Sequence, residues 1–274
     1  MANEVHTEEA LTRSAHHAPS GLEFIRFQVE GPVAHVTLQR PEHNLLNEQM
    51  LRELAAGIAM VADNSAVKLI VLDAAGKVFS AGVDIGEYTV ERAFPMLDAF
   101  HAACIAMVEA PKPVLVIVDG AAIGGGAELV AYGDLVVATP RARFALPEIT
   151  IGMFPPLAST MLPHLVGPKR ALELVLTGEA ISAERARDLG LVNRLAPEAQ
   201  LQAAVNDLIG KITAQSGAVL GMAKRAILSG MGMSLRDSLQ NSMNIFLNEL
   251  YRLEDSQEGL RALLEKRQPQ WKNR

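Results

Sequence analysis

Residues 118–139 read VDGAAIGGGAELVAYGDLVVAT, and this segment is the most informative about the fold. It begins where an apolar run over residues 114–118 ends, and it finishes in a second apolar run over residues 135–139. Short apolar runs of this kind are typical of buried strands. Between them, three glycines precede a segment that we interpret as a helix. The order strand, glycine turn, helix, strand predicts an α/β protein with a parallel sheet.

The same alternation extends toward the N-terminus. Residues 24–39 contain two β-rich runs separated by Glu-Gly-Pro, which predicts a β-hairpin. Residues 51–61 repeat apolar side chains at helical spacing, and residues 67–72 form another buried strand. A further helix is predicted to end near Glu109, and residues 141–148 form a further strand candidate. The first half of the chain is therefore predicted to be a sheet covered by helices.

From Pro156 onward the pattern changes and helical periodicity dominates, with one strand candidate at residues 191–195. One helical stripe near the C-terminus is longer than a small helix needs for its own core face. Its members are Leu235, Leu239, Met243, Phe246, Leu247, Leu250 and Tyr251. We expect this stripe to pack against a partner surface.

Composition excludes several classes of protein. The chain has 274 residues, a formal net charge of −6 and a single cysteine, Cys104, so neither a disulfide framework nor a cysteine metal cluster is expected. The acidic balance argues against a nucleic-acid or polybasic membrane surface, and no apolar run approaches the ~20 residues of a membrane span. Residues 1–20 lack a secretory signal pattern and are predicted to be a mobile tail, in which His16 and His17 are solvated. A cytoplasmic protein is expected.

The three glycines from Gly124 to Gly126 provide the first candidate site. Without Cβ atoms the backbone can approach a ligand closely, and free N–H groups at a helix start favour negative charge, as in an oxyanion site. Glu128 lies one turn further on, so its carboxylate can reach the same pocket. The glycine spacing fits neither a phosphate-binding loop nor a dinucleotide fingerprint. An ordinary glycine turn beside a solvated glutamate remains the alternative.

Two more segments follow predicted strands. The first is VFSAGVDI at residues 78–85, whose N–H groups offer a second donor, and the second is Leu146-Pro147-Glu148. In α/β sheets, ligands bind at the carboxyl ends of strands. Glu128 and Glu148 could therefore converge, and repulsion with burial would separate their pKa values into an acid and a base. Alternatively, either glutamate is a surface charge.

Residues 79–85 (FSAGVDI), 118–139 and 142–152 (ARFALPEITIG), in this order, resemble the crotonase family of enoyl-CoA hydratases and isomerases. The resemblance implies repeated ββα units and a helical C-terminal trimerisation region. It divides the chain into the tail at 1–20, an acyl-CoA-binding core at 21–200 and an oligomerisation region at 201–274. A homotrimer or hexamer that binds an acyl-CoA thioester is implied.

The resemblance also assigns roles. The N–H groups of Val83 and Gly125 correspond to the oxyanion hole, and Glu128 and Glu148 correspond to the two hydratase glutamates, with the acid and the base left open. Asp84 is expected to brace the oxyanion turn. The residues expected to bind substrate are Ala81, Val83, Asp84, Ile85, Gly125, Phe154 and Pro155. No metal and no separate cofactor are implied, since coenzyme A is part of the substrate.

Two departures from the family pattern bear on the substrate. Residues 151–159 read IGMFPPLAS, where ordinary hydratases carry a glycine-rich stretch, and this resembles the hydratases of cyclohexa-1,5-diene-1-carbonyl-CoA; an acyclic enoyl-CoA hydratase with an unusual loop is the alternative. Gly86 replaces a lysine that contacts coenzyme A in many relatives, and Lys224 and Lys266 are candidate substitutes. An isomerase, an acyl-CoA hydrolase and a catalytically silent member that binds a partner or RNA also stay open.

Overall fold

A six-stranded sheet runs through the computed structural model, which describes residues 21–274. In spatial order its strands are β1 (Ile25–Glu30), β2 (Val33–Leu38), β3 (Leu69–Ala74), β4 (Val114–Val118), β6 (Leu135–Ala138) and β9 (Arg194–Leu195). Strands β1 and β2 form an antiparallel hairpin, and every other neighbouring pair is parallel. The predicted hairpin and the predicted α/β class are confirmed.

A second, smaller sheet holds the strand that leads into the glycine turn at residues 124–126 and two strands that come later in the chain. It comprises β5 (Ala121–Ile123), β7 (Arg143–Ala145) and β8 (Ile181–Ser182), with β5 parallel to β7. Strands β5 and β8 were not predicted, because two or three residues are too few to show an alternating pattern. A single bridge between Ser80 and Ala122 connects the loop after β3 to this sheet. The two predicted glycine turns are therefore neighbours in space.

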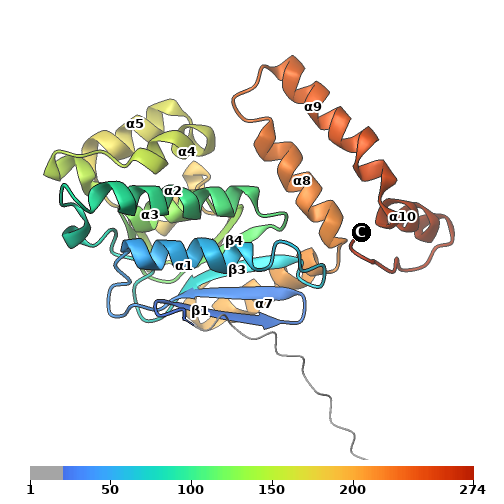
Figure 1. Cartoon of the computed structure of the whole chain (residues 1–274), viewed down its shortest axis with the longest axis horizontal. Helices are drawn as coiled ribbons and strands as arrows, with labels where there is room; N and C mark the ends of the chain where they lie inside the picture. The colour runs from blue at the N-terminus through green and yellow to red at the C-terminus, as the bar shows by residue number, and fades with distance from the viewer. Residues whose placement is uncertain (1–20) are drawn as a thin grey trace, which may run out of the picture.

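Helices cover both faces of the large sheet. Helices α1 (Glu48–Ala59) and α2 (Ala93–Glu109) pack on one face, and α7 (Leu201–Thr213) packs on the other (Figure 1). Alternation along β3 explains this, since Ile70 and Leu72 join the core beneath α1 and α2. Leu69 and Val71 instead contact the cluster that contains Val205 of α7. Both faces of the strand are buried, as its continuous apolar run predicts.

The remaining helices of the core lie at the end of the molecule that carries the small sheet. They are α3 (Gly125–Ala131), α4 (Pro156–Val166), α5 (Pro168–Thr177) and α6 (Ala183–Leu189). Short 3-10 turns connect elements of the described chain; they are η1 (Ile85–Glu87), η2 (Pro147–Ile151), η3 (Glu198–Gln200) and η4 (Leu250–Arg252). Helix α4 begins at consecutive prolines, whose fixed φ suits the first turn of a helix.

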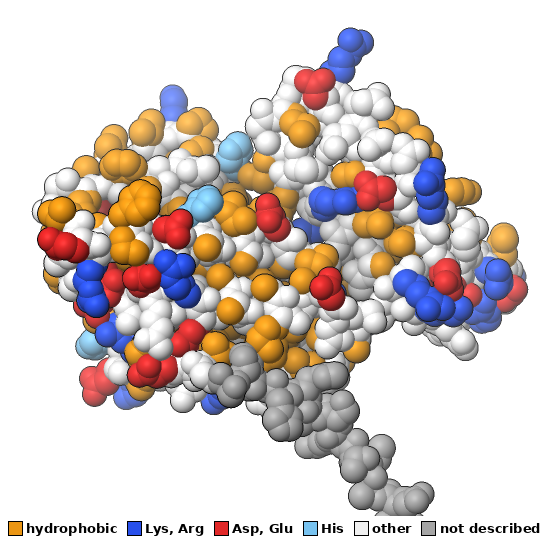
Figure 2. Space-filling model, viewed as in Figure 1, with side chains coloured by type: hydrophobic (Ala, Val, Ile, Leu, Met, Phe, Trp, Pro, Cys, Tyr) orange, Lys and Arg blue, Asp and Glu red, His pale blue; other side chains and the backbone are white. Residues whose placement is uncertain are grey.

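The C-terminal helices extend away from the sheet (Figure 1). They are α8 (Gly217–Ser229), α9 (Leu235–Asn248) and α10 (Glu254–Leu264). Helix α9 exposes Leu235, Leu239, Met243, Phe246 and Leu247, all on the predicted stripe. Figure 2 shows apolar side chains among the charged ones on this arm. Within residues 21–274 no helix is long and apolar enough to cross a membrane; the predicted tail at residues 1–20 lies outside the described part of the chain.

Candidate active site

The two glycine turns meet at the carboxyl ends of β3 and β5. A Cβ atom placed on Gly82 would stand 3.7 Å from the backbone nitrogen of Gly125, and one placed on Gly125 would stand 3.0 Å from Cγ2 of Val83. Only glycine permits so close an approach of the two backbones. The structure therefore brings together the two segments that were predicted to supply N–H donors.

The N–H groups of Val83 and Gly125 are both free. The carbonyl of Gly82 accepts from Leu46 (2.9 Å), so the N–H of Val83, on the opposite side of the same trans peptide, points away from Leu46. Gly125 is the first residue of α3, where N–H groups have no partner within the helix. Within residues 21–274 neither N–H donates to another protein group, so both can bind an oxygen atom.

Glu128 lies on α3 and is 3% exposed. Its Oε1 atom accepts hydrogen bonds from the N–H groups of Leu157 (2.9 Å) and Ala158 (2.8 Å), at the start of α4. Burial raises the pKa of Glu128 to about 7; those two hydrogen bonds oppose the rise, and the charge of Glu148 adds to it. A carboxyl group in this state exchanges its proton near neutral pH, which suits acid–base chemistry.

Glu148 lies in η2, directly after β7, and its carboxyl group contacts the glycine turn. It is 7% exposed, and a Cβ atom on Gly124 would stand 2.6 Å from its Oε1 atom. Its Oε2 atom is buried and has no hydrogen-bond partner in the described part of the chain. Burial raises the pKa of Glu148 above its usual range. The structure thus places Glu148 against the glycine turn and Glu128 close enough for the charge of Glu148 to raise its pKa.

Asp84 follows Val83 and ties the oxyanion turn to the loop after β2. Its carboxylate accepts from Arg40 Nη2 (2.8 Å) and from the N–H of Gly86 (3.1 Å). Arg40 also donates to the carbonyl of Leu45 (2.8 Å). The hydrogen bond from Arg40 is the main reason that the pKa of Asp84 is lowered. The geometry is that of the predicted brace, and Arg40 is a contributor that sequence reasoning missed.

The other predicted substrate-binding residues differ in exposure. Ala81 and Ile85 are exposed on the oxyanion turn, with Ile85 83% exposed. Phe154 is 62% exposed, whereas Pro155 is buried at the start of α4. Pro155 therefore fixes the backbone just before Leu157 and Ala158, whose N–H groups donate to Glu128. The ring of Phe154 is exposed to solvent.

Two tyrosines near the glutamates were not predicted to take part. Tyr88 follows η1 and is half-buried; burial, followed by the charges of Glu148 and Glu128, raises its pKa to about 12. Tyr132 donates from its hydroxyl to the carbonyl of Leu157 (3.1 Å). Its spacing of four residues from Glu128 was the available signal, because such pairs share a helix face.

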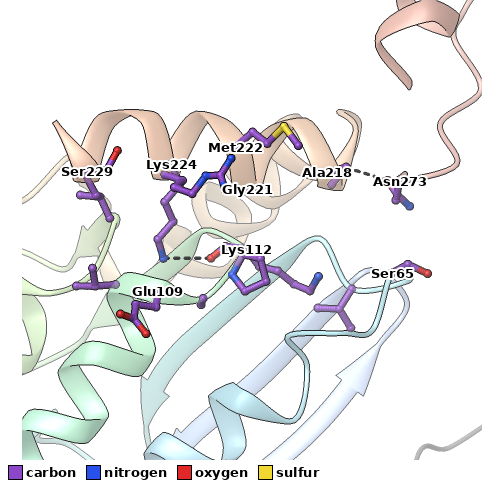
Figure 3. Close-up of a pocket in the computed structure, with 16 residues that line it drawn as sticks. Ser65, Glu109, Lys112, Ala218, Gly221, Met222, Lys224, Ser229 and Asn273 are labelled. Atoms are coloured by element: carbon purple, nitrogen blue, oxygen red, sulfur yellow. Dashed lines mark hydrogen bonds between the residues drawn. The ribbon is translucent and has the colours of Figure 1, made fainter. Parts of the chain in front are cut away.

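A cavity with a volume of about 620 Å³ lies elsewhere, between α8 and the turn after α2 (Figure 3). Lys224 points into this region and is buried. It pairs with Asp134 (2.8 Å) and donates to the carbonyls of Met107 and Lys112. The expectation that Lys224 contacts coenzyme A is therefore wrong, because its ammonium group is fully engaged. Lys266 is exposed, so its proposed contact stays a prediction.

Residues 28–274 match the family described as enoyl-CoA hydratase/isomerase. The chain belongs to this family. It is 33% identical over 247 residues to cyclohexa-1,5-dienecarbonyl-CoA hydratase from Thauera aromatica, and the aligned part covers 89% of this chain and 95% of the relative. It is 34% identical over 261 residues to a probable enoyl-CoA hydratase from Bacillus subtilis, covering 90% and 98% respectively.

Solved structures agree with the family assignment. The enoyl-CoA hydratase from Mycobacterium smegmatis superposes with a TM-score of 0.86 at 32% identity, covering 91% of this chain and 99% of that one. The crotonase fold, with its α/β core and C-terminal helices, is thereby confirmed. The predicted enzyme class, a lyase of the enoyl-CoA hydratase type, is confirmed as well.

Proposed function

We propose that the protein adds water to the double bond of a ring-containing enoyl-CoA thioester, with cyclohexa-1,5-diene-1-carbonyl-CoA as the candidate substrate. The observation that carries the hydratase chemistry is the meeting of two free N–H groups, on Val83 and Gly125, with two buried glutamates. A thioester carbonyl bound by those N–H groups becomes an enolate as water attacks. Each donor of this kind contributes about 3 kcal/mol of transition-state stabilisation.

We infer different roles for the two glutamates from their hydrogen bonds. Two N–H donors converge on one oxygen of Glu128, which favours the ionised form, so Glu128 takes the proton from water. Glu148 has a buried oxygen with no donor, which favours the protonated form, so Glu148 gives a proton to the α-carbon. The water oxygen bonds to the β-carbon, and the π pair of the double bond passes through the enolate to the new C–H bond.

The acyl group is proposed from the wall that follows η2. Phe154, Pro155 and Pro156 replace a flexible glycine-rich stretch with a rigid backbone and an exposed aromatic ring. A planar or near-planar ring stacks on such a face better than a flexible chain does, because less conformational freedom is lost on binding. The Thauera aromatica relative is named for a cyclic dienoyl-CoA. Both observations support a ring as the acyl group.

The test follows the absorbance of the unsaturated thioester and identifies products by mass, with crotonyl-CoA and the cyclic dienoyl-CoA as separate substrates. We expect a gain of one water with the cyclic substrate. Water gain from crotonyl-CoA alone would overturn the ring proposal and leave an acyclic hydratase. An isomer, free coenzyme A or no change with either substrate would instead indicate an isomerase, a hydrolase or a silent binding protein.

Variants test the residues in the same assay. Glu128→Gln and Glu148→Gln are each expected to lower turnover about a hundredfold or more, the range for general acid–base groups. Glu30→Gln, in the exposed end of the β1–β2 hairpin, is the matched control and should retain activity. Phe154→Ala should raise KM for the cyclic substrate and leave KM for crotonyl-CoA unchanged. Equal effects on both substrates would contradict the role of the aromatic wall.

We further propose that α9 joins copies of the chain into a trimer or hexamer in the cytoplasm. Five large apolar side chains are exposed along this one helix, and burying them would favour association. Light scattering coupled to size-exclusion chromatography should give the mass of three or six chains. Leu239→Glu together with Phe246→Glu should reduce that mass, and a wild-type mass of one chain would overturn the proposal.

A further inference from the structure

The hydroxyl of Tyr132 contacts the same peptide group that holds Glu128. Tyr132 donates to the carbonyl oxygen of Leu157 (3.1 Å), and the N–H of Ala158 donates to Glu128 Oε1 (2.8 Å). The carbonyl of Leu157 and the N–H of Ala158 belong to one planar peptide unit, so they point in opposite directions. A continuous chain of hydrogen bonds therefore runs from Tyr132 through this peptide to Glu128.

Tyr132 and Glu128 reach this peptide from the same helix. They are four positions apart at the C-terminal end of α3, so their side chains leave one face of the helix. Together they contact both ends of the Leu157–Ala158 peptide in the first turn of α4. The peptide cannot rotate without breaking one of the two hydrogen bonds, which fixes the direction of its N–H.

We propose that Tyr132 is a positioning residue for Glu128: its hydroxyl locks the Leu157–Ala158 peptide so that the peptide N–H is aimed at the carboxylate. This inference rests on the proposed role of Glu128 as the base. A hydrogen bond accepted by a carbonyl also polarises its peptide and strengthens the N–H as a donor. Tyr132 thereby favours the ionised form of Glu128 without touching the substrate.

Of the other titratable groups that face Glu128, only Glu148 opposes its ionisation. Glu148 in η2 raises its pKa by repulsion. Cys104 on α2 and Tyr88 after η1 are the remaining titratable neighbours, and burial raises the pKa of each, so both are neutral near pH 7. Burial likewise raises the pKa of Tyr132 to about 12. Its hydroxyl therefore remains a donor over the whole working range.

The first experiment compares Tyr132→Phe with the matched control Tyr251→Phe, whose ring is 53% exposed on η4. Phenylalanine keeps the packing of the ring and removes only the hydroxyl. We expect Tyr132→Phe to raise the apparent pKa of the acidic limb, in a plot of kcat against pH, by about 0.3 to 1 unit. At pH 7, where about half of Glu128 is ionised in the wild type, the same shift should lower kcat about 1.5- to 5-fold while KM stays within about twofold. Tyr251→Phe should change neither quantity.

A second measurement does not depend on turnover. The carboxyl carbon of Glu128 can be followed by ¹³C NMR in the labelled full-length protein, with the signal assigned by its absence in Glu128→Gln. The pH midpoint of the titration of this signal should be higher in Tyr132→Phe than in the wild type. If the wild type lacks hydratase activity, the proposed function fails, and this titration still tests the positioning. An unchanged ¹³C midpoint, or an unchanged pH profile in an active enzyme, would overturn the role of Tyr132.

Discussion

The carboxyl group of Glu148 occupies the space that a side chain on Gly124 would fill. A Cβ atom at Gly124 would stand 2.6 Å from Glu148 Oε1, and Gly124 has a φ of +52°, a conformation that other residues rarely adopt. The glycine turn therefore does more than free N–H groups for an oxyanion. It also makes room for one of the two acids directly beside them.

Gly124→Ala should therefore displace Glu148 and impair catalysis. We expect kcat/KM for the substrate to fall about a hundredfold, comparable to loss of an acid–base group. Gly31→Ala is the control, because Gly31 has a similar φ of +56° but no atom within 4 Å of a Cβ. Gly124→Ala should also lose more stability than Gly31→Ala in thermal unfolding, because only the Cβ atom at Gly124 meets another side chain. Retained activity in Gly124→Ala would contradict the need for this close contact.

Burial of Glu128 should make stability depend on pH. Its pKa is about 7 in the folded protein against 4.5 for the free side chain, so the folded state holds the proton more tightly between these values. The contribution of Glu128 to the free energy of unfolding is therefore fully present below pH 4.5. It is lost as the pH rises to 7, and this loss amounts to about 3 kcal/mol. Glu128→Gln, which does not titrate, should avoid this loss.

Urea unfolding at pH 5 and pH 8 would measure the effect. The free energy of unfolding of Glu128→Gln relative to the wild type should be larger at pH 8 than at pH 5. The glutamine carbonyl can still accept from Leu157 and Ala158, so the variant keeps its fold. A constant difference between the two pH values would show that Glu128 does not titrate in this range.

Asp84→Asn should weaken the brace of the oxyanion turn. The variant keeps an acceptor for the N–H of Gly86 but loses the ion pair with Arg40. Since this pair is partly exposed, we expect a modest fall in kcat of about three- to tenfold, with little change in stability. The low pKa of Asp84 keeps the pair intact at pH 5, so the effect should not depend on pH. Asp207→Asn, in an exposed pair with Lys211, is the control.

Local sequence patterns predicted the elements that position the site. The apolar runs of β3 and β4 marked buried strands, and the glycines after β3 and β5 marked turns at their carboxyl ends. Because parallel strands end at one edge of a sheet, Glu128 and Glu148 could be expected in a common pocket. These inferences depend on residues that are close in sequence or on simple connectivity.

Contacts between distant residues could not be read in this way. Arg40 pairs with Asp84 across 44 positions, and Tyr132 reaches Leu157 across 25. Neither pairing leaves a local period or composition signal. Lys224 shows the converse problem, because a lysine in a helical stretch resembles a surface cation. Its burial against Asp134 depends on how α8 docks on the core, which the sequence pattern does not contain.

Lys224→Met tests whether this buried pair attaches α8 to the core. The Lys224 side chain is 5% exposed and that of Asp134 is 15% exposed, so removal of the cation leaves a buried carboxylate without its partner. We expect a loss of about 3–5 kcal/mol in urea unfolding. Lys211→Met removes an exposed partner of Asp207 and should cost less than about 1 kcal/mol. Adding Asp134→Asn to Lys224→Met should restore part of the stability, since no buried charge remains. If the double variant is as unstable as Lys224→Met, the lost stability comes from packing of the Lys224 side chain and not from the unpaired charge.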